Sequence, residues 1–338
     1  MTDSGSPTLI VFGEALLDDF PHQKVLGGAP FNVARASASL GCAPLMISRV
    51  GNDGNGQLVR DEMRRFALDQ SGMQTDTVHP TGLVKVHVEL NAHRFEIMTN
   101  QAYDHIECEP AVLAVDRFKS MQQGRQQPTL IYYGTLAQRN KTSRETLTRL
   151  LSAGQSTNYL DLNLRDGQYS FDEIVTSLLH ADILKVNEDE LQLLVRKCQP
   201  EAGQLNCDLN SPEIVDAFFE ALQHLLVLFK LRAIIVTLGA QGYVYMNDQG
   251  VRVNGWQTET PQLALVDTVG CGDAFSSVFL AGLMHGWPTE LTLQRAHAFA
   301  GSVCTIRGAV STDMKFYRDW QTAWGLNATP DTAIGQAQ

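Results

Sequence analysis

Short apolar runs alternate with helical patterns along nearly the whole chain, and this alternation limits the fold more than any other feature of the sequence. Most runs are rich in Val, Ile and Leu and end at a glycine, an asparagine or an acidic residue. An apolar run of this kind is typical of a strand buried on both faces of a parallel sheet. Strands that alternate with helices predict a doubly wound, mostly parallel α/β sheet flanked by helices. The runs interpreted as buried strands are 8–12, 45–50, 129–133, 158–162, 181–186 and 233–238.

One segment departs from this alternation. Residues 83–90 and 94–98 alternate apolar and polar positions, and residues 91–93 suit the turn of a hairpin. A two-stranded ribbon is not stable alone, so we expect it to cover the protein's own site or a second subunit. Its histidines, with His105 and His297, are interpreted as structural or solvated.

The segment 263–285 carries the strongest functional pattern. A short apolar run leads into Gly270-Cys-Gly-Asp273, and a helical pattern follows to about His285. Glycines at a strand-to-helix turn direct backbone N–H groups outward, and a helix N-terminus favours an anion. A carboxylate beside such an anion site fits a general base for phosphoryl transfer. Alternatively, Asp273 only complements the helix dipole. A Rossmann fingerprint is disfavoured because Phe275 occupies its third glycine position.

Composition excludes several classes of protein. With 44% hydrophobic and 19% charged residues, the 338-residue chain is ordinary for a globular protein, and its net charge of −11 argues against a nucleic-acid surface. The apolar runs are too short to span a bilayer, and the polar N-terminus is unlike a signal peptide. The six cysteines lack metal-ligand spacing. We therefore expect a cytoplasmic protein with reduced thiols, although Cys198 and Cys207 are close enough in sequence to pair.

Asp267-Thr-Val-Gly-Cys-Gly-Asp-Ala-Phe275 resembles the Asp-Thr-x-Gly-Ala-Gly-Asp-x-Phe signature of the ribokinase-like (PfkB) carbohydrate kinases. The resemblance implies that Asp273 is the catalytic base and that the N–H groups of Gly270, Cys271 and Gly272 form the anion hole. Val269 and Cys271 depart from the family's usual Thr and Ala. Since the anion hole uses backbone donors, Cys271 adds bulk beside the phosphate without removing a donor.

Two motifs near the N-terminus are similar to the sugar-binding side of that family. Gly13-Glu-Ala-Leu-Leu-Asp18 resembles the opening of fructokinase-type members, which implies that Asp18 binds sugar hydroxyls; a solvated turn, or Asp19 in its place, is the alternative. Gly27-Gly-Ala-Pro-Phe-Asn32-Val-Ala resembles the family's Gly-Gly-x-x-x-Asn-x-Ala motif. It implies that Gly27 and Gly28 approach the sugar and that Asn32 contacts it. Gly51-Asn-Asp-Gly-Asn-Gly56 matches another family motif or is a turn only.

Asp161-Leu-Asn-Leu-Arg165 also resembles a motif of fructokinases and ketodeoxygluconate kinases, and it follows a strand. Alternating side chains at a strand end point the same way, so we expect Asp161, Asn163 and Arg165 to face one edge of the sheet. The resemblance implies that Asn163 and Arg165 hold the substrate. A surface ion pair between Asp161 and Arg165 is the alternative.

The nucleotide side is implied by two further motifs. Asn187-x-x-Glu190 matches the family's Asn-x-x-Glu, in which these residues organise Mg²⁺ and its waters; Asn187 is also suited to cap the helix that begins at Glu188. Thr237-Leu-Gly239-Ala-Gln-Gly242 resembles the family's nucleotide motif, so Thr237, Gly239 and Gly242 are expected to border ATP. The resemblance also implies a monovalent cation, such as K⁺, near Asp267.

Together the motifs imply an ATP- and Mg²⁺-dependent sugar kinase, most similar to fructokinase. Ribokinase, ketodeoxygluconate kinase, nucleoside kinase and a non-catalytic sugar-binding regulator are the alternatives. We expect one kinase domain over residues 8–325, with a β-lid from about 14–26 and 81–106. A homodimer through the lid and a disordered tail at 326–338 are further expectations.

Overall fold

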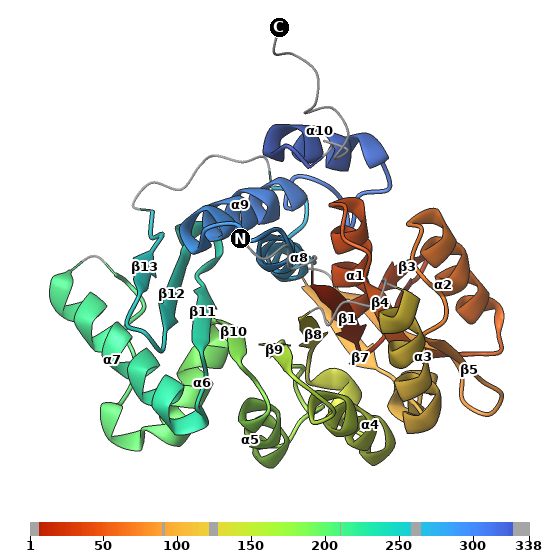
Figure 1. Cartoon of the computed structure of the whole chain (residues 1–338), viewed down its shortest axis with the longest axis horizontal. Coiled ribbons are helices and arrows are strands. Elements are labelled where there is room, and N and C mark those ends of the chain that lie inside the picture. The colour runs from red at the N-terminus through yellow and green to blue at the C-terminus, as the bar shows by residue number, and fades with distance from the viewer. Residues whose placement is uncertain (1–6, 90–91, 122–127, 210, 258–264, 327–338) are drawn as a thin grey trace, which may run out of the picture.

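The computed structural model describes residues 7–89, 92–121, 128–209, 211–257 and 265–326 of the chain. Its centre is a nine-stranded sheet in the order β13-β12-β11-β10-β9-β8-β1-β4-β5 (Figure 1). All neighbours from β11 to β5 are parallel, and β12 and β13 add an antiparallel edge. The strands are β1 (Thr8–Phe12), β4 (Leu45–Gly51), β5 (Met73–Asp76), β8 (Thr129–Tyr133), β9 (Ser156–Asp161), β10 (Ile183–Asn187), β11 (Ala233–Thr237), β12 (Tyr243–Asn247) and β13 (Arg252–Asn254).

Helices cover both faces of this sheet (Figure 1), which confirms the doubly wound α/β class. One face carries α3 (Cys108–Met121), α4 (Lys141–Leu151), α5 (Phe171–Leu179), α6 (Glu188–Cys198) and α7 (Pro212–Phe229). The other carries α1 (Ala29–Ser39), α2 (Gly54–Arg65), α8 (Cys271–His285), α9 (Thr289–Val303) and α10 (Met314–Trp324).

The core divides into two apolar clusters because successive residues of a strand face opposite sides of the sheet. In β1, Ile10 and Phe12 join the cluster beneath α3–α7, whereas Leu9 and Val11 join the cluster beneath α1, α8 and α9. A strand buried on both faces needs apolar residues at every position, which explains the continuous apolar runs of the sequence.

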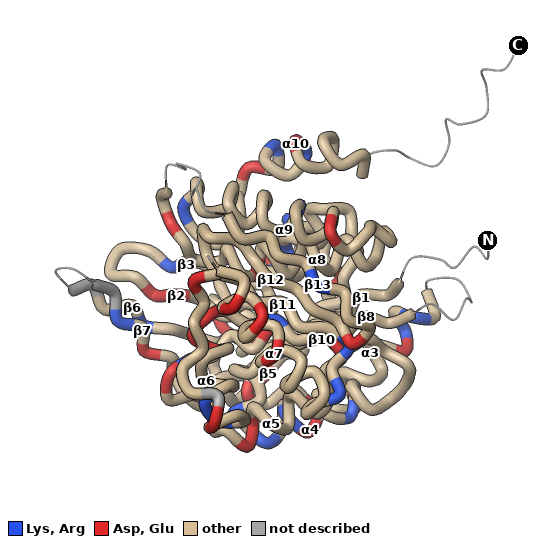
Figure 2. The backbone as a smooth tube through the Cα atoms, turned by 90° about the vertical axis from the view of Figure 1, so that its left-hand side faces the viewer, with Lys and Arg blue, Asp and Glu red and all other residues tan. Residues whose placement is uncertain are grey.

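A second, smaller sheet has the order β3-β2-β6-β7. Its strands β2 (Leu16–Phe20) and β3 (Gln23–Gly27) form one hairpin, and β6 (Gly82–Glu89) and β7 (Ala92–Ile97) form another. The hairpins join through a parallel pairing of β2 with β6. Figure 2 shows β6 and β7 projecting from one side of the molecule. The small β-sheet of the predicted fold class is confirmed, and its role as a lid stays a prediction.

An asparagine side chain fixes the start of α4. Asn140, whose side chain accepts a hydrogen bond from the Thr142 N–H, is the N-cap of α4. The helix therefore begins at Lys141, before the capping-box-like sequence Thr142-Ser-Arg-Glu145. In α5 a capping box joins Ser170 and Glu173, so the same short-range chemistry operates one helix later.

The segment 196–212 is polar in composition but contributes to the core. Its residues Leu205, Cys207 and Leu209 are buried in the cluster beneath α6 and α7. Their spacing of two alternates with polar neighbours, so an extended segment lays one apolar edge on the core. The polar composition concealed this edge.

The order of the strands in the main sheet indicates where a ligand site lies. From β1 the chain proceeds to β4 on one side and later to β8 on the other, so the order reverses between β1 and β8. Ligands of open α/β sheets bind outside the carboxyl ends of the strands at such a reversal. Acidic and basic positions are interspersed over the outer elements (Figure 2). No helix within the described part of the chain combines the length and the apolar character that crossing a membrane requires.

Candidate active site

Asp273 lies in the first turn of α8, buried, where the carboxyl edge of the sheet meets the helix. The N-cap residue Gly270 has a φ of 79°, and a β-carbon there would collide with Ala309. Glycine is therefore required at this turn. The Cys271 N–H makes only a long bond of 3.4 Å to the Thr268 carbonyl, so it is available to an anion at the positive end of the helix.

The segment before this turn corrects one expectation. Residues 263–264 lie outside the described residues, and 265–269 form no strand. Leu265, Val266 and Val269 are instead half or more exposed. The apolar run thus gives an exposed apolar surface directly beside the turn.

Asn32 of α1 holds the Asp273 carboxyl group. Its Nδ2 donates to Asp273 Oδ2 at 2.7 Å, and its Oδ1 accepts from Arg35 Nη2 at 2.6 Å. Arg35 is itself buried and paired with Glu62. Arg35 thus fixes the orientation of the Asn32 side chain. Asn32, which the motif predicts to contact sugar, therefore also orients Asp273, the predicted base.

Burial raises the pKa of Asp273 to about 6. The Asn32 hydrogen bond opposes this rise by stabilising the carboxylate, and the nearby negative charge of Asp161 adds to it. A carboxyl group with a pKa near 6 is charged at neutral pH and still basic enough to accept a proton.

A buried ion pair lies directly beneath the turn. Lys185 Nζ on β10 contacts both carboxylate oxygens of Asp161 on β9 at 3.0 Å, and both residues are buried. Asp161 Oδ2 also accepts from Ser276 Oγ of α8 at 2.8 Å. A β-carbon on Gly272 would lie 2.9 Å from Lys185 Nζ. The ammonium group therefore supports the first turn of α8, a role for which the sequence interpretation assigned no residue.

The loop after β9 differs from the expected alternation. Asn163 has a φ of 43°, and this left-handed residue breaks the strand geometry, so Asp161 and Arg165 do not share one face. Asp161 is paired with Lys185, and among the described contacts no ion pair joins it to Arg165, so the alternative of a surface ion pair does not hold. Arg165 is exposed, and its charge lowers the pKa values of Glu14, Asp18 and Asp273 against the effect of burial. Arg165 therefore faces this acidic cluster.

Two more carboxyl groups border the site from the segment after β1. Burial raises the pKa of Glu14 to about 7 and that of Asp18 to about 6. Glycines make room for them, because a β-carbon on Gly27 would lie 2.8 Å from Asp18 Oδ2 and one on Gly28 would lie 2.6 Å from the Glu14 carbonyl oxygen. Glu14 was not recognised as a site residue, although its position in the Gly13-Glu-Ala motif was a signal for it.

The nucleotide-side candidates lie at the next strand ends. Asn187 and Thr237 are register partners at the carboxyl ends of β10 and β11, and the turn Gly239–Gln241 with Gly242 follows. Asn187 caps α6, and Glu190 completes the capping box. The Glu190 carboxylate accepts from the N–H groups of Leu164 and Asn187 at 2.8 and 2.9 Å. The capping role is confirmed, and the nucleotide and metal roles stay predictions.

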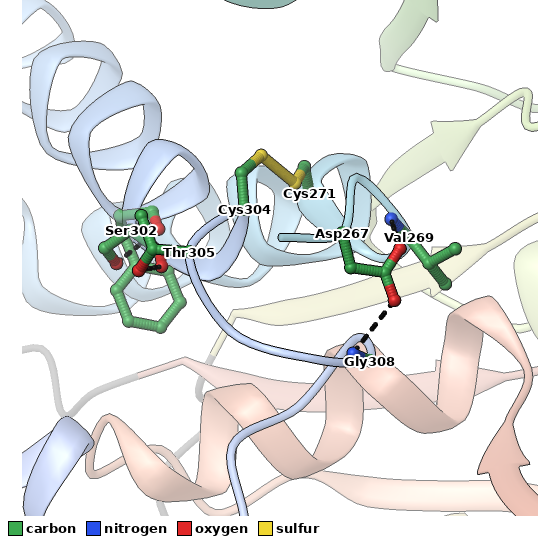
Figure 3. The surroundings of a disulfide bond; sticks show 8 residues. Asp267, Val269, Cys271, Ser302, Cys304, Thr305 and Gly308 are labelled. Atoms are coloured by element: carbon green, nitrogen blue, oxygen red, sulfur yellow. Dashed lines mark hydrogen bonds between the residues drawn. A yellow bond between two sulfur atoms is a disulfide. The ribbon is translucent and has the colours of Figure 1, made fainter. Parts of the chain in front are cut away.

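Asp267 joins two segments beside the turn. Its carboxylate accepts from the N–H groups of Val269 and Gly308, both at 3.0 Å (Figure 3). Cys271 and Cys304 form a disulfide at the same place. The expectation that all thiols are free is therefore wrong, because packing of α8 on α9 brings together two cysteines 33 residues apart. Cys198 and Cys207 are both free.

The donor set suits Mg²⁺ held largely by phosphate oxygens and water. Within the described residues no three His, Cys, Asp or Glu side chains converge as a metal cluster. Both oxygens of Glu190 already accept backbone hydrogen bonds. Mg²⁺ keeps several waters when it binds with phosphates, so one carboxylate acting through water is sufficient.

Comparisons with known proteins agree with this geometry. The family model for "pfkB family carbohydrate kinase" matches residues 12–315. The chain is 27% identical to probable fructokinase-7 of Arabidopsis thaliana, over 90% of this chain and 89% of that protein. The solved structure of fructokinase from Vibrio cholerae O395, bound to fructose, ADP and calcium ion, matches with a TM-score of 0.70 at 22% identity, covering 94% of this chain and 98% of the other. Aminoimidazole riboside kinase from Salmonella enterica, complexed with its riboside and an ATP analog, matches with a TM-score of 0.70 at 21% identity, covering 94% and 99%.

Proposed function

The chain belongs to the pfkB family of carbohydrate kinases and is a phosphotransferase that acts on a sugar hydroxyl, and we propose that its substrates are ATP and fructose. The observation that carries the mechanism is the bond from Asn32 to the buried Asp273, at the N-terminus of α8. This bond orients Asp273, the proposed base, beside the turn whose backbone N–H groups are the proposed donors to phosphate. Fructokinases among the relatives support the choice of sugar.

In this mechanism Asp273 removes the proton from a sugar hydroxyl as its oxygen attacks the terminal phosphate of ATP. The N–H groups of Gly270, Cys271 and Gly272 stabilise the charge on the transferring group's oxygens. Arg165, which faces the carboxyl groups of Glu14, Asp18 and Asp273, orients the substrate together with Asn163. The small sheet acts as a lid that excludes water, which would otherwise accept the phosphate.

The acidic cluster favours a neutral, polyhydroxylated substrate. Glu14, Asp18 and Asp273 all have raised pKa values, and the exposed Arg165 is the cation that faces all three. Carboxylates accept hydrogen bonds from sugar hydroxyls but repel a phosphate or carboxylate on the substrate. Free fructose therefore fits better than fructose 6-phosphate or ketodeoxygluconate.

ATP lies with its phosphates at the α8 turn and its sugar along Asn187, Thr237, Gly239 and Gly242. The exposed Leu265 and Val266 suit one face of the purine. Mg²⁺ bound to the phosphates, with Glu190 acting through water, neutralises phosphate charge when present. A monovalent cation near Asp267 completes the proposal.

The test is sugar-dependent ADP release with Mg-ATP across fructose, fructose 6-phosphate, ribose, ketodeoxygluconate, glucose and adenosine. The highest kcat/KM is expected with fructose. A higher value with another neutral sugar or adenosine would replace fructose and keep the mechanism. A higher value with either anionic sugar would contradict the argument from the acidic cluster. Sugar binding by calorimetry with no ADP release would favour a regulator.

Asp18→Asn is expected to raise KM for fructose roughly tenfold or more with a smaller effect on kcat. A neutral amide accepts hydroxyl hydrogen bonds more weakly than the carboxylate does. Steady-state kinetics measure the split between KM and kcat. The matched control is Asp19→Asn, one residue along β2 and thus on the opposite face of its sheet. A larger effect of Asp19→Asn would transfer the sugar contact to Asp19.

The acid side of the pH profile is expected to report the Asp273 carboxyl group. Only the carboxylate accepts a proton, so kcat/KM falls as pH drops through about 6, the pKa of Asp273. Glu14 and Asp18 titrate in the same range, so assignment needs a variant. Asn32→Ala removes a bond that lowers this pKa, and the acid limb should move to higher pH. If Asn32→Ala leaves the acid-side fall of kcat/KM at the same pH, titration of Asp273 does not cause that fall.

A further inference from the structure

The disulfide between Cys271 and Cys304 joins two elements at the edge of the proposed phosphate site. Cys271 is the first residue of α8, and Cys304 is the C-cap of α9 (Figure 3). Their Cα atoms are 6.2 Å apart, a separation usual for bridged cysteines. Both residues are only partly buried, so small thiol reagents reach the pair from solvent.

The same two segments are otherwise held by hydrogen bonds. The N–H groups of Val266 and Asp267 donate to the Cys304 carbonyl oxygen at 2.9 and 3.3 Å, and the Gly308 N–H donates to Asp267 at 3.0 Å (Figure 3). Segment 266–271 is therefore joined to segment 304–308 by three reversible contacts and one covalent bond. Breaking the disulfide leaves these hydrogen bonds, which are weaker than a covalent bond and can break and re-form.

Cys271 differs chemically from the buried cysteines. Burial raises the pKa of Cys42 to about 12 and that of Cys207 to about 11, so neither forms a reactive thiolate. A cysteine at a helix N-terminus is instead favoured as the thiolate, the form that attacks disulfides. Disulfides that form in reducing compartments are usually transient and redox-sensing.

We propose that Cys271 and Cys304 are a reversible thiol-oxidation site that controls phosphoryl transfer. One thiolate attacks a low-molecular-weight disulfide and releases one of its halves as a thiol. The second cysteine then displaces the other half, so that one disulfide is reduced to two thiols and the two protein thiols become the Cys271–Cys304 bond. A thiol reductant reverses both steps.

In this proposal the disulfide form of the protein transfers phosphate more slowly than the reduced form. This direction rests on the proposed function, in which the Cys271 N–H is an anion-hole donor and Val266 borders the purine. In this mechanism ATP enters and ADP leaves between segments 266–271 and 304–308, which therefore have to separate. The hydrogen bonds between the two segments can break when the nucleotide enters, whereas the disulfide cannot. Oxidation therefore slows turnover but leaves the Cys271 N–H in place.

The experiment uses the full chain, reduced with dithiothreitol or oxidised with oxidised glutathione. Oxidation is expected to lower kcat for sugar-dependent ADP release on the order of tenfold, within the usual range of coupling between a switch and a site. Dithiothreitol should restore it. Mass spectrometry of unreduced peptides should find Cys271 linked to Cys304. Cys304→Ser should keep the reduced enzyme's activity and lose its response to the oxidant, and Cys271→Ala should also be unresponsive. Cys108→Ser, at a free exposed cysteine, should respond like the unmodified protein.

Each other outcome is decisive. A linked peptide with equal kcat in both states would overturn the control of transfer, and absence of the linked peptide after oxidation would overturn the site. If the reduced protein phosphorylates none of the sugars, the proposed function fails separately. Stopped-flow measurement of ADP binding then compares the two redox states, and equal association and dissociation rates would overturn the switch.

Discussion

Asp273→Asn is expected to lower kcat for sugar phosphorylation by on the order of a hundred- to ten-thousandfold, the usual contribution of a general base. The amide has nearly the shape of the carboxylate and still accepts the hydrogen bond from Asn32 Nδ2. The change therefore removes the proton acceptor while the fold and the orientation of the side chain persist. Steady-state kinetics with Mg-ATP measure kcat, and calorimetry should show that fructose still binds.

The matched control is Asp172→Asn, because Asp172 is also in the first turn of a helix but is exposed on α5. Its kcat should stay within about twofold of the unmodified protein. Undiminished turnover in Asp273→Asn would refute the mechanism. Loss of fructose binding in the same variant would show that Asp273 binds substrate rather than accepting its proton.

Lys185→Met is expected to lower the free energy of unfolding by about 3–5 kcal/mol, because it leaves the buried Asp161 carboxylate without its partner. Burial lowers and the Asp161 charge raises the pKa of Lys185, with a net upward shift, so Lys185 carries its charge in the folded protein. Urea denaturation measures the loss. Since Asp161 also accepts from Ser276 in α8, kcat should fall together with stability.

Two controls separate this effect from loss of any ion pair. Lys315→Met removes the exposed pair with Asp319, and exposed pairs of this kind contribute little. The double change Lys185→Met with Asp161→Leu removes both charges and should recover most of the lost stability. If the double variant is as unstable as the two single losses added together, the cost comes from packing rather than from an unpaired charge.

The fold was predictable because its signals are local. A continuous apolar run such as Thr8–Phe12 identifies a strand buried on both faces, and the glycine-rich turn before Asp273 identifies the start of α8. The hairpin of β6 and β7 follows from simple alternation. Each of these features is decided within about ten residues, the range over which pattern is informative.

The missed features depend on register and packing. Lys185 and Asp161 are opposite one another because β9 and β10 pair in that register, which neither strand specifies alone. Leu205 and Leu209 are buried because the segment joins the apolar cluster that also contains α6 and α7. Cys271 meets Cys304 only when α9 folds back along α8. Long-range pairings of this kind leave no periodic trace in the sequence.

The candidate site was predictable in its members and less so in its connections. Asn32 contacts Asp273, and Gly27 lies against Asp18, while the binding roles of these residues stay predictions. The bond that orients Asp273 joins residues 241 positions apart, and a motif lists both residues without showing that they touch. Asn163, whose left-handed backbone turns Arg165 away from the Asp161 face, was beyond any argument from alternation.

The parallel pairing of β2 with β6 has a consequence for the order in which the protein folds. Leu16 pairs with Gly82 and Leu17 with Leu83, and the chain between them supplies α1, β4, α2 and β5. Closing so long a loop costs chain entropy before the strands gain contacts. The two hairpins therefore dock onto one another only after the β1–β4–β5 side of the main sheet has assembled. During synthesis the N-terminal hairpin emerges first with its β2 edge unpaired, so we expect the small sheet to be completed late in folding.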